Sequence, residues 1–250
     1  MNNQIKSTSN DTWFFGHPKG MVTLFFTEMW ERMSFYGMRA LLVLYMTAAV
    51  DSTFNPGMGL SSEAAQAIYG IYVGMVYFMV IPGGWLADNI LGHQKAVLIG
   101  AIIIAMGHIT LAIPLSETFF LGLALVVIGT GLLKGNISTI VGRLYKPGDS
   151  RVQAGYTIFY MSINIGSALG FLVVAWLGEK IGWHWGFGAA GVGMIFGVMQ
   201  YIFFKRLLGE AANKPNEMPV AQRNGYLKWS KITAAFMVIV LGLGLSGYVS

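Results

Sequence analysis

The first long apolar stretch of this chain contains four ionisable side chains. Glu28, Glu31, Arg32 and Arg39 lie within residues 20–49, among apolar and aromatic residues. A stretch of this length and composition is typical of a membrane-spanning helix. A charge at the bilayer centre costs roughly 2.5–3.5 kcal/mol on insertion scales, so several charges in one span indicate a polar pathway with a partner for each. The segment therefore predicts a transporter.

Composition supports an all-α membrane protein. Hydrophobic residues make up 55% of the chain and charged residues 11%, against about 25% charged residues in soluble domains. Ten-residue alternating segments of an outer-membrane barrel are absent from the sequence. There is no Cys, which excludes disulfides and thiolate sites. We find no cleavable signal peptide, catalytic triad, phosphate loop or metal-ligand spacing, so we expect neither an enzyme nor a cofactor.

Apolar segments of about 20 residues predict six membrane helices. A further apolar segment begins near Leu227 and continues to Ser250, where the chain ends without a polar tail, and this suggests truncation. The segment 182–186 (Gly-Trp-His-Trp-Gly) is predicted to be a loop. The expected helices are 20–49, 62–87, 94–114, 117–141, 152–178 and 185–204, and the expected domains are an N-terminal segment 1–19, a six-helix bundle 20–206, a linker 207–226 and a seventh helix 227–250.

The basic residues between the predicted helices set the orientation. Two precede the first span, one follows the second, three follow the fourth and six follow the sixth, whereas the opposite side has Lys180 alone. Because loops rich in Lys and Arg stay in the cytoplasm, the N-terminus is predicted to be cytoplasmic. This pattern explains most of the +5 charge and gives little support to a nucleic-acid partner.

Helical spacing places the charges of the first span on one stripe. Glu28 and Arg32 are an i, i+4 pair in the favourable order, and Phe35 and Tyr36 lie close to the same stripe. Glu31 and Arg39 are left pointing along the same cavity for partners elsewhere. The alternative is that these charges only hold helices together.

The fourth span adds a further charge, Lys134. It lies well before the predicted end of that helix, which is a long reach for a lysine extending to the membrane surface, although that remains the alternative. The intramembrane charges of the six predicted spans then carry a formal excess of +1, which an anionic substrate group could neutralise. Burial disfavours an ionised carboxylate and a nearby cation favours it, so moving the cation would switch a proton on or off.

Other polar or small residues are weaker candidates. Tyr72, Tyr77 and Asn164 could line the same cavity or simply pack between helices. His108 is predicted to form a hydrogen bond between helices. Small-residue faces that would allow close helix packing are predicted at Gly70 and Gly74, Gly166 and Gly170, and Gly193 and Gly197.

Three motifs together resemble a known family. They are Glu28-x-x-Glu31-Arg32 followed by Phe35-Tyr36-Gly37, the segment 83–92 (GGWLADNILG), and the segment 159–166 (FYMSINIG). In this order they resemble the proton-coupled oligopeptide transporters, the POT or PTR family of the major facilitator superfamily, over residues 15–204.

The resemblance implies an N-terminal six-helix bundle plus one further helix and assigns residue roles. Glu28, Glu31, Arg32 and Lys134 would form the proton-coupling network. Arg39 and Lys134 would attract the carboxylate of a di- or tripeptide, and Tyr36, Tyr72 and Asn164 would contact the peptide. Two departures are Phe35, where many members have tyrosine, and Gly135, where proline is frequent.

The resemblance also implies a second six-helix bundle that this chain lacks, so we expect residues 1–250 alone not to transport. The expected partners are the peptide, the lipid bilayer of the cytoplasmic (inner) membrane and the missing C-terminal bundle, with the proton as coupling ion. Nitrate or another anion as cargo, and a non-transporting membrane scaffold, remain alternatives.

Overall fold

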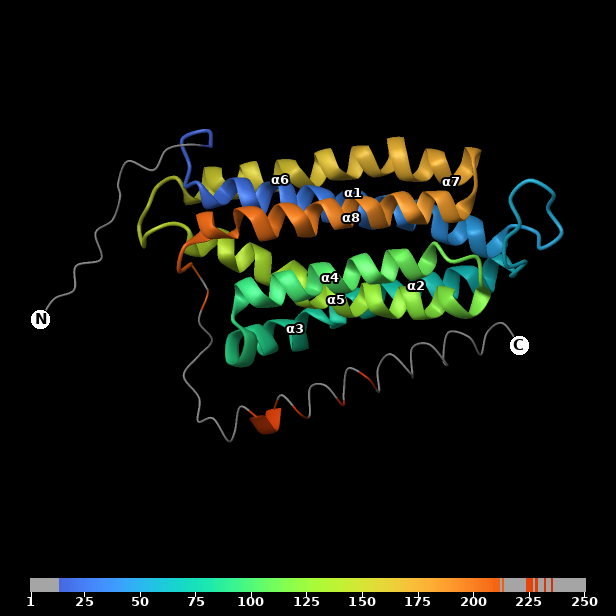
Figure 1. The fold of residues 1–250 in the computed structure, drawn as a ribbon, viewed down its shortest axis with the longest axis horizontal. Coiled ribbons are helices and arrows are strands. Elements are labelled where there is room, and N and C mark those ends of the chain that lie inside the picture. Colours follow the sequence, from blue (N-terminus) through green and yellow to red (C-terminus); the bar gives the residue numbers. More distant parts are fainter. Residues whose placement is uncertain are drawn as a thin grey trace, which may run out of the picture.

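The computed structural model describes residues 14–211, 213, 224–226, 228, 232 and 235. Helices joined by short connections make up nearly all of this part (Figure 1). The α-helices are α1 (Gly20–Thr47), α2 (Ser62–Phe78), α3 (Val80–Leu86), α4 (His93–Leu111), α5 (Ser116–Arg143), α6 (Val152–Leu169), α7 (Trp176–Lys180) and α8 (Trp183–Phe204). Two π-helical segments, Ala87–Leu91 and Gly170–Ala175, and a 3₁₀ turn, Lys205–Leu208, continue α3, α6 and α8.

In the described part of the chain, six helical segments are long enough to cross a membrane. Five of them are also sufficiently apolar by composition: Ser62–Leu91, His93–Leu111, Glu117–Arg143, Val152–Lys180 and Trp183–Leu208. The sixth, α1, has 28 residues, which corresponds to about 40 Å of helix, and carries the four charges. The predicted all-α membrane fold is confirmed, and each of these six helices lies close to its expected position.

The helices form two groups that pack against each other. In Figure 1, α1, α6 and α8 lie together in one half of the bundle, and α2, α3, α4 and α5 lie in the other. α1 packs against both α6 and α8, while α4 packs against α5 and α8. Most of α1 is consequently buried, including the part that carries charge.

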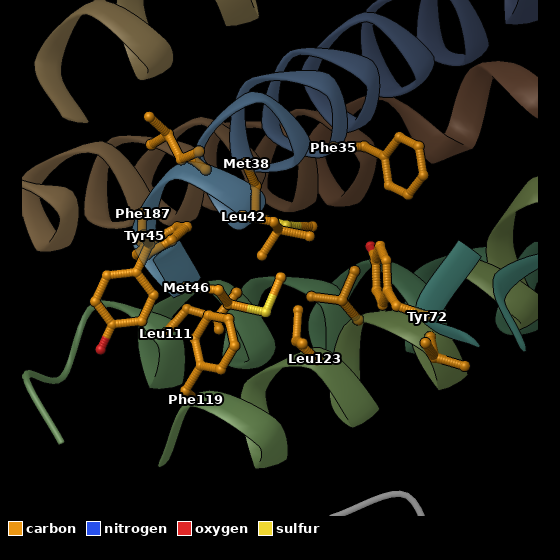
Figure 2. Packing of buried hydrophobic residues seen from close by; sticks show 14 of the residues in the cluster. Phe35, Met38, Leu42, Tyr45, Met46, Tyr72, Leu111, Phe119, Leu123 and Phe187 are labelled. Atoms are coloured by element: carbon orange, nitrogen blue, oxygen red, sulfur yellow. The ribbon is translucent and has the colours of Figure 1, made fainter. Parts of the chain in front are cut away.

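One apolar cluster joins the two halves. The α1 side chains recur every three or four residues, which places them on one helix face, and they meet residues from α2, α4, α5 and α8 (Figure 2). The labelled members are Phe35, Met38, Leu42, Tyr45 and Met46 from α1, with Tyr72, Leu111, Phe119, Leu123 and Phe187.

Small residues allow the closest helix contacts, as predicted for two of the three glycine pairs. A Cβ on Gly170 of α6 would lie 2.6 Å from the Met33 carbonyl oxygen of α1, and Gly166 is equally tight against Met29. Gly193 and Gly197 of α8 face Met33 and Trp30. The prediction for Gly70 and Gly74 is wrong within the described part of the chain, because no atom lies within 4 Å of a Cβ built there.

Several local predictions are corrected by the structure. The segment 182–186 is the start of α8 from Trp183 onward rather than a loop. The second membrane helix does not end at residue 87 but continues as a π-helical segment to Leu91, because the polar Asp88 and Asn89 lower the hydropathy of this segment without ending the helix. His108 is buried, and neither ring nitrogen has a hydrogen-bond partner among the described residues, so the predicted bond between helices is wrong.

The predicted domain boundaries remain predictions. Lys205–Leu208 is helical across the expected end of the bundle at residue 206. Most of the expected linker and seventh helix lies outside the described residues, although positions 224–226, 228, 232 and 235 are helical.

Candidate functional site

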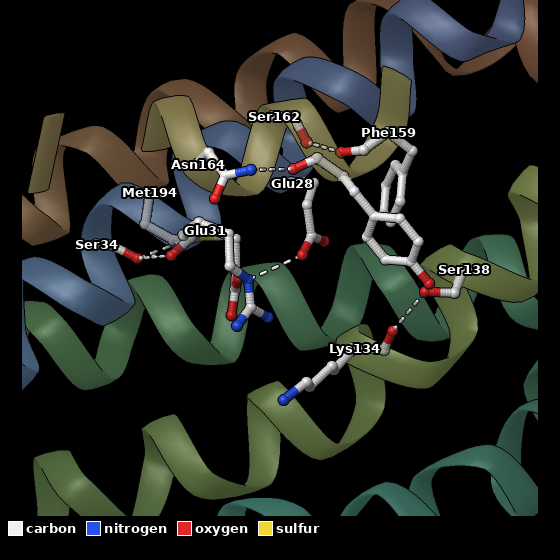
Figure 3. A network of polar contacts seen from close by, with 11 residues as sticks. Glu28, Glu31, Ser34, Lys134, Ser138, Phe159, Ser162, Asn164 and Met194 are labelled. Carbon is white, nitrogen blue, oxygen red and sulfur yellow. Dashed lines mark hydrogen bonds and ion pairs between the residues drawn. The ribbon is translucent and has the colours of Figure 1, made fainter. Parts of the chain in front are cut away.

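The charged cluster is built on the middle of α1. Arg32 Nε lies 2.8 Å from Glu28 Oε1 and 2.5 Å from Glu31 Oε2. All three residues are buried, with at most 3% of each exposed (Figure 3). The Glu28–Arg32 pair is as predicted. Glu31, expected to point elsewhere, shares the same arginine because its carboxylate reaches the guanidinium along the helix surface.

Some polar atoms of the cluster have no hydrogen-bond partner among the described residues. Glu28 Oε2, Glu31 Oε1 and Arg32 Nη2 are buried without a hydrogen-bond partner among the described residues. When both acids are ionised, the two carboxylates and one guanidinium carry a net charge of −1. Because burying an uncompensated charge is unfavourable, the cluster favours either one proton or one additional cation.

Lys134 is the nearby cation that can supply that charge. It extends from α5, on the opposite side of the acids from Asn164 of α6 (Figure 3). Its charge interacts electrostatically with that of Glu31, but no ion pair joins them in the described structure. Its Nζ instead lies 4.2 Å from the ring centroid of Tyr77 on α2, a cation–π contact.

Arg39 lies about two helical turns beyond Arg32 and has a different environment. Its Nε donates a hydrogen bond of 2.9 Å to the hydroxyl of Tyr69 on α2, and Nη2 donates to the same oxygen. Its Cζ lies 5.3 Å from the ring centroid of Phe35, 5.8 Å from that of Tyr36 and 5.4 Å from that of Tyr69. No acid in the described part of the chain pairs with it.

The three candidate peptide-contacting residues differ in burial and in their partners. Tyr36 is half-buried beside Arg39. Tyr72 is 1% exposed, and its hydroxyl is buried without a hydrogen-bond partner among described atoms. Asn164 is exposed on α6 and donates a hydrogen bond to the Tyr160 carbonyl, 3.3 Å away.

Two aromatic residues of α2 belong to this site beside the predicted ones. Tyr69 binds Arg39, and Tyr77 lies under Lys134. The sequence indicates Tyr77 only as one possible cavity residue and does not indicate Tyr69. Their shared signal is a tyrosine within an apolar span, which is too common in membrane helices to select them.

A second polar group lies at the connection between the second and third membrane helices. His93 Nδ1 is 2.8 Å from Asn136 Oδ1, and His93 Nε2 is 3.1 Å from Asp88 Oδ1. The Asn136 amide donates to the carbonyls of Gly83 and Leu132. The motif 83–92 is thereby linked to the middle of α5.

A third group joins the chain before α1 to the connection between α5 and α6. The buried His17 makes a 2.8 Å hydrogen bond with the hydroxyl of Tyr145, and Arg151 donates to the Gly16 carbonyl. Burial, followed by the charge of Arg151, lowers the pKa of His17. Hydrogen bonds from Arg151 lower the pKa of Asp149 to about 2.

Comparison with known proteins identifies the family. The model of the POT family matches residues 94–241, which is more than half of the chain. The chain belongs to the POT family. The resemblance of the three sequence motifs is thereby confirmed, and the chain is part of a transporter family rather than an enzyme family.

Relatives of this POT chain are named as peptide transporters. It is 45% identical to the peptide transporter YePEPT of Yersinia enterocolitica over 94% of this chain and 47% of the relative. It is 43% identical to a di-/tripeptide transporter of Lactococcus lactis over 92% of this chain and 46% of that protein. The chain therefore spans about half the length of the curated relatives that it matches.

Solved POT structures have the same fold. A crystal structure of the peptide transporter POT in complex with sulfate superposes with a TM-score of 0.83 at 47% identity, over 92% of this chain and 47% of that one. A POT family transporter in complex with 5-aminolevulinic acid gives a TM-score of 0.84 at 38% identity, over 96% of this chain and 49% of that one.

Proposed function

We propose that this chain provides the first six-helix bundle of a proton-coupled symporter of di- and tripeptides. The observation that carries the proposal is the buried Glu28–Arg32–Glu31 cluster in the first membrane helix, with Lys134 close by. The names of the related peptide transporters support the substrate class. They also favour transport over the scaffold alternative.

The acidic cluster binds a proton when the charge of Lys134 moves away from it. When Lys134 approaches the acids, its charge balances the cluster and both carboxylates stay ionised. When Lys134 turns away, to Tyr77 or to a substrate carboxylate, one acid takes up a proton and restores neutrality. The cluster therefore couples the position of one cation to the binding of one proton.

The peptide lies between this bundle and a second one, as in transporters that rock around a central site. Arg39 and Lys134 attract its carboxylate, and Tyr36 and Asn164 offer polar contacts. Tyr72 takes part from inside the core, through its buried hydroxyl, which has no hydrogen-bond partner among the described atoms. No nucleic acid or organic cofactor takes part, and the coupling ion is the proton.

The protein lies in the cytoplasmic (inner) membrane with its N-terminus in the cytoplasm. The unequal distribution of basic residues over the connections supports this orientation. The proposed domains are those predicted from the sequence: an N-terminal segment 1–19, a bundle 20–206, a linker 207–226 and a further helix 227–250.

The test is uptake of a labelled dipeptide into liposomes that contain the full-length transporter carrying residues 1–250. We expect accumulation against a concentration gradient only when protons are more concentrated outside. Uptake that ignores the proton gradient would contradict symport. Accumulation of nitrate but no dipeptide would instead support the anion alternative.

The cluster is tested in the same assay by Glu31→Gln and Lys134→Gln. Each substitution removes one side of the charge exchange, so accumulation should be lost although folded protein is still obtained. Glu179→Gln is the matched control, because Glu179 is an exposed acid at the end of α7. Normal driven accumulation in both cluster variants would contradict the proposed coupling.

A further inference from the structure

Arg32 and Arg39 occupy one helix but have opposite kinds of partner. Arg32 is held by two carboxylates and is buried. Arg39 is only half-buried, and its hydrogen-bond partner is the neutral phenol of Tyr69. A phenol fixes a guanidinium without neutralising it, so Arg39 keeps its full charge for an anion that comes from outside the described structure.

The Tyr69 contact also selects which edge of Arg39 is available. Nε and Nη2 both donate to the one hydroxyl oxygen, which uses the side edge of the planar group. The end of the fork, formed by Nη1 and the second hydrogen of Nη2, has no acceptor in the described chain. That edge has the spacing that binds a carboxylate through two parallel hydrogen bonds.

Three aromatic rings restrict the guanidinium further. Phe35, Tyr36 and Tyr69 all lie within 6 Å of Cζ. An aromatic ring attracts the guanidinium through its face, and this attraction does not fix how the group is rotated about the Cζ–Nε direction. The hydrogen bonds to the hydroxyl of Tyr69 fix that rotation.

We infer that Tyr69 is a positioning residue, which orients the outer edge of Arg39 toward the carboxylate of the transported peptide. The inference rests on the proposed function, because Arg39 is there assigned to the peptide carboxylate. It adds a residue of α2 that does not itself touch the substrate. It also makes selection of a free carboxylate depend on one phenolic oxygen.

The test measures equilibrium binding to the full-length transporter without a proton gradient. The probes are a dipeptide and the same dipeptide with an amidated C-terminus. Tyr69→Phe keeps the ring and removes the acceptor, so binding of the free-acid peptide should weaken about ten- to hundredfold, as expected when a hydrogen bond to a charged group is lost. Binding of the amidated peptide should hardly change.

A double-mutant cycle separates positioning from general damage. In an Arg39→Gln background, Tyr69→Phe should have no further effect on either probe. Tyr45→Phe is the control, since Tyr45 is a core residue of α1 whose hydroxyl makes no hydrogen bond to a described residue. If Tyr69→Phe yields no folded protein, Tyr69→Trp replaces it, because indole keeps an aromatic ring but accepts no hydrogen bond.

Three results would overturn the inference. The first is an equal loss of affinity for both probes after Tyr69→Phe, and the second is an undiminished Tyr69→Phe effect when Arg39 is already Gln. Equal wild-type affinity for the two peptides overturns it as well. Proton-driven uptake could still be normal in each case, so these outcomes are distinct from failure of symport.

Discussion

At the scale of single residues, Arg32 is the hub of the charged cluster. Removing it by Arg32→Gln leaves two buried carboxylates without their cation. Breaking a buried ion pair in this way typically costs about 3–5 kcal/mol. We therefore expect a loss of this size in the free energy of unfolding of residues 1–250, measured by denaturant titration in detergent micelles.

Arg39→Gln is the matched comparison for this stability measurement. It removes a hydrogen-bonded cation whose partner is neutral, so a smaller loss of about 1–2 kcal/mol is expected. Glu31→Gln added to Arg32→Gln should recover part of the larger loss. Equal effects of the two arginine substitutions would show that the carboxylates are not held by Arg32.

At this scale, the sequence predicts which types of residue form the site better than it predicts which residues contact each other. The i, i+4 relation of Glu28 and Arg32 follows from helix geometry alone. The contacts of Arg39 with Tyr69 and of Lys134 with Tyr77 do not, because they depend on the rotation and offset of α2 relative to α1 and α5. Hydropathy leaves both quantities undetermined.

At the scale of helices, the contact between α1 and α6 depends on glycine. Gly166→Ala would place a Cβ against the Met29 carbonyl and 2.9 Å from the Arg32 Cβ. The helices would have to separate, at a cost of about 1–3 kcal/mol for overpacking. We expect a lower unfolding free energy in detergent and weaker fluorescence transfer between probes placed on α1 and α6.

Gly70→Ala is the control for this substitution, since a Cβ there meets nothing within 4 Å. Alanine is the better helix former by about 1 kcal/mol, so stability should stay level or rise. A comparable loss in both variants would point to a general intolerance of alanine rather than to the α1–α6 contact.

The positions of the helices could be predicted from sequence, and their irregularities could not. Long apolar segments separated by turn formers and charges gave spans that end within a few residues of the observed ones. The π-helical segment Gly170–Ala175 lies within apolar sequence that hydropathy treats as continuous, and the segment Ala87–Leu91 extends the second span beyond its predicted end at residue 87. Glycine spacing likewise failed to distinguish the packed Gly166 from the open Gly70.

At the scale of the molecule, His17 joins the N-terminal turn to the α5–α6 connection. Its lowered pKa means that protonation is disfavoured while the turn is docked. The docked state should therefore be fully favoured above pH 6.5, and should weaken progressively as pH falls below that value. Asp149 stays ionised throughout this range, because its pKa is held at about 2.

Spin labelling can follow this change. The chain has no cysteine, so Phe15→Cys introduces a unique label at a residue that is 77% exposed. Label mobility should increase as pH is lowered from 7.5 to about 5, across the ordinary range of histidine. His17→Gln cannot titrate and should abolish the dependence; an unchanged transition in that variant would assign it to another group.

The unusual composition of α1 has a consequence for how the protein is made. This helix leaves the ribosome before the other described helices, yet its charges make it a poor substrate for direct release into lipid, with each central charge opposing insertion by about 2.5–3.5 kcal/mol. Its main packing partners, α6 and α8, are synthesised more than 100 residues later. We therefore expect α1 to wait beside the translocon until those partners emerge, which links biogenesis to the charges proposed to serve transport.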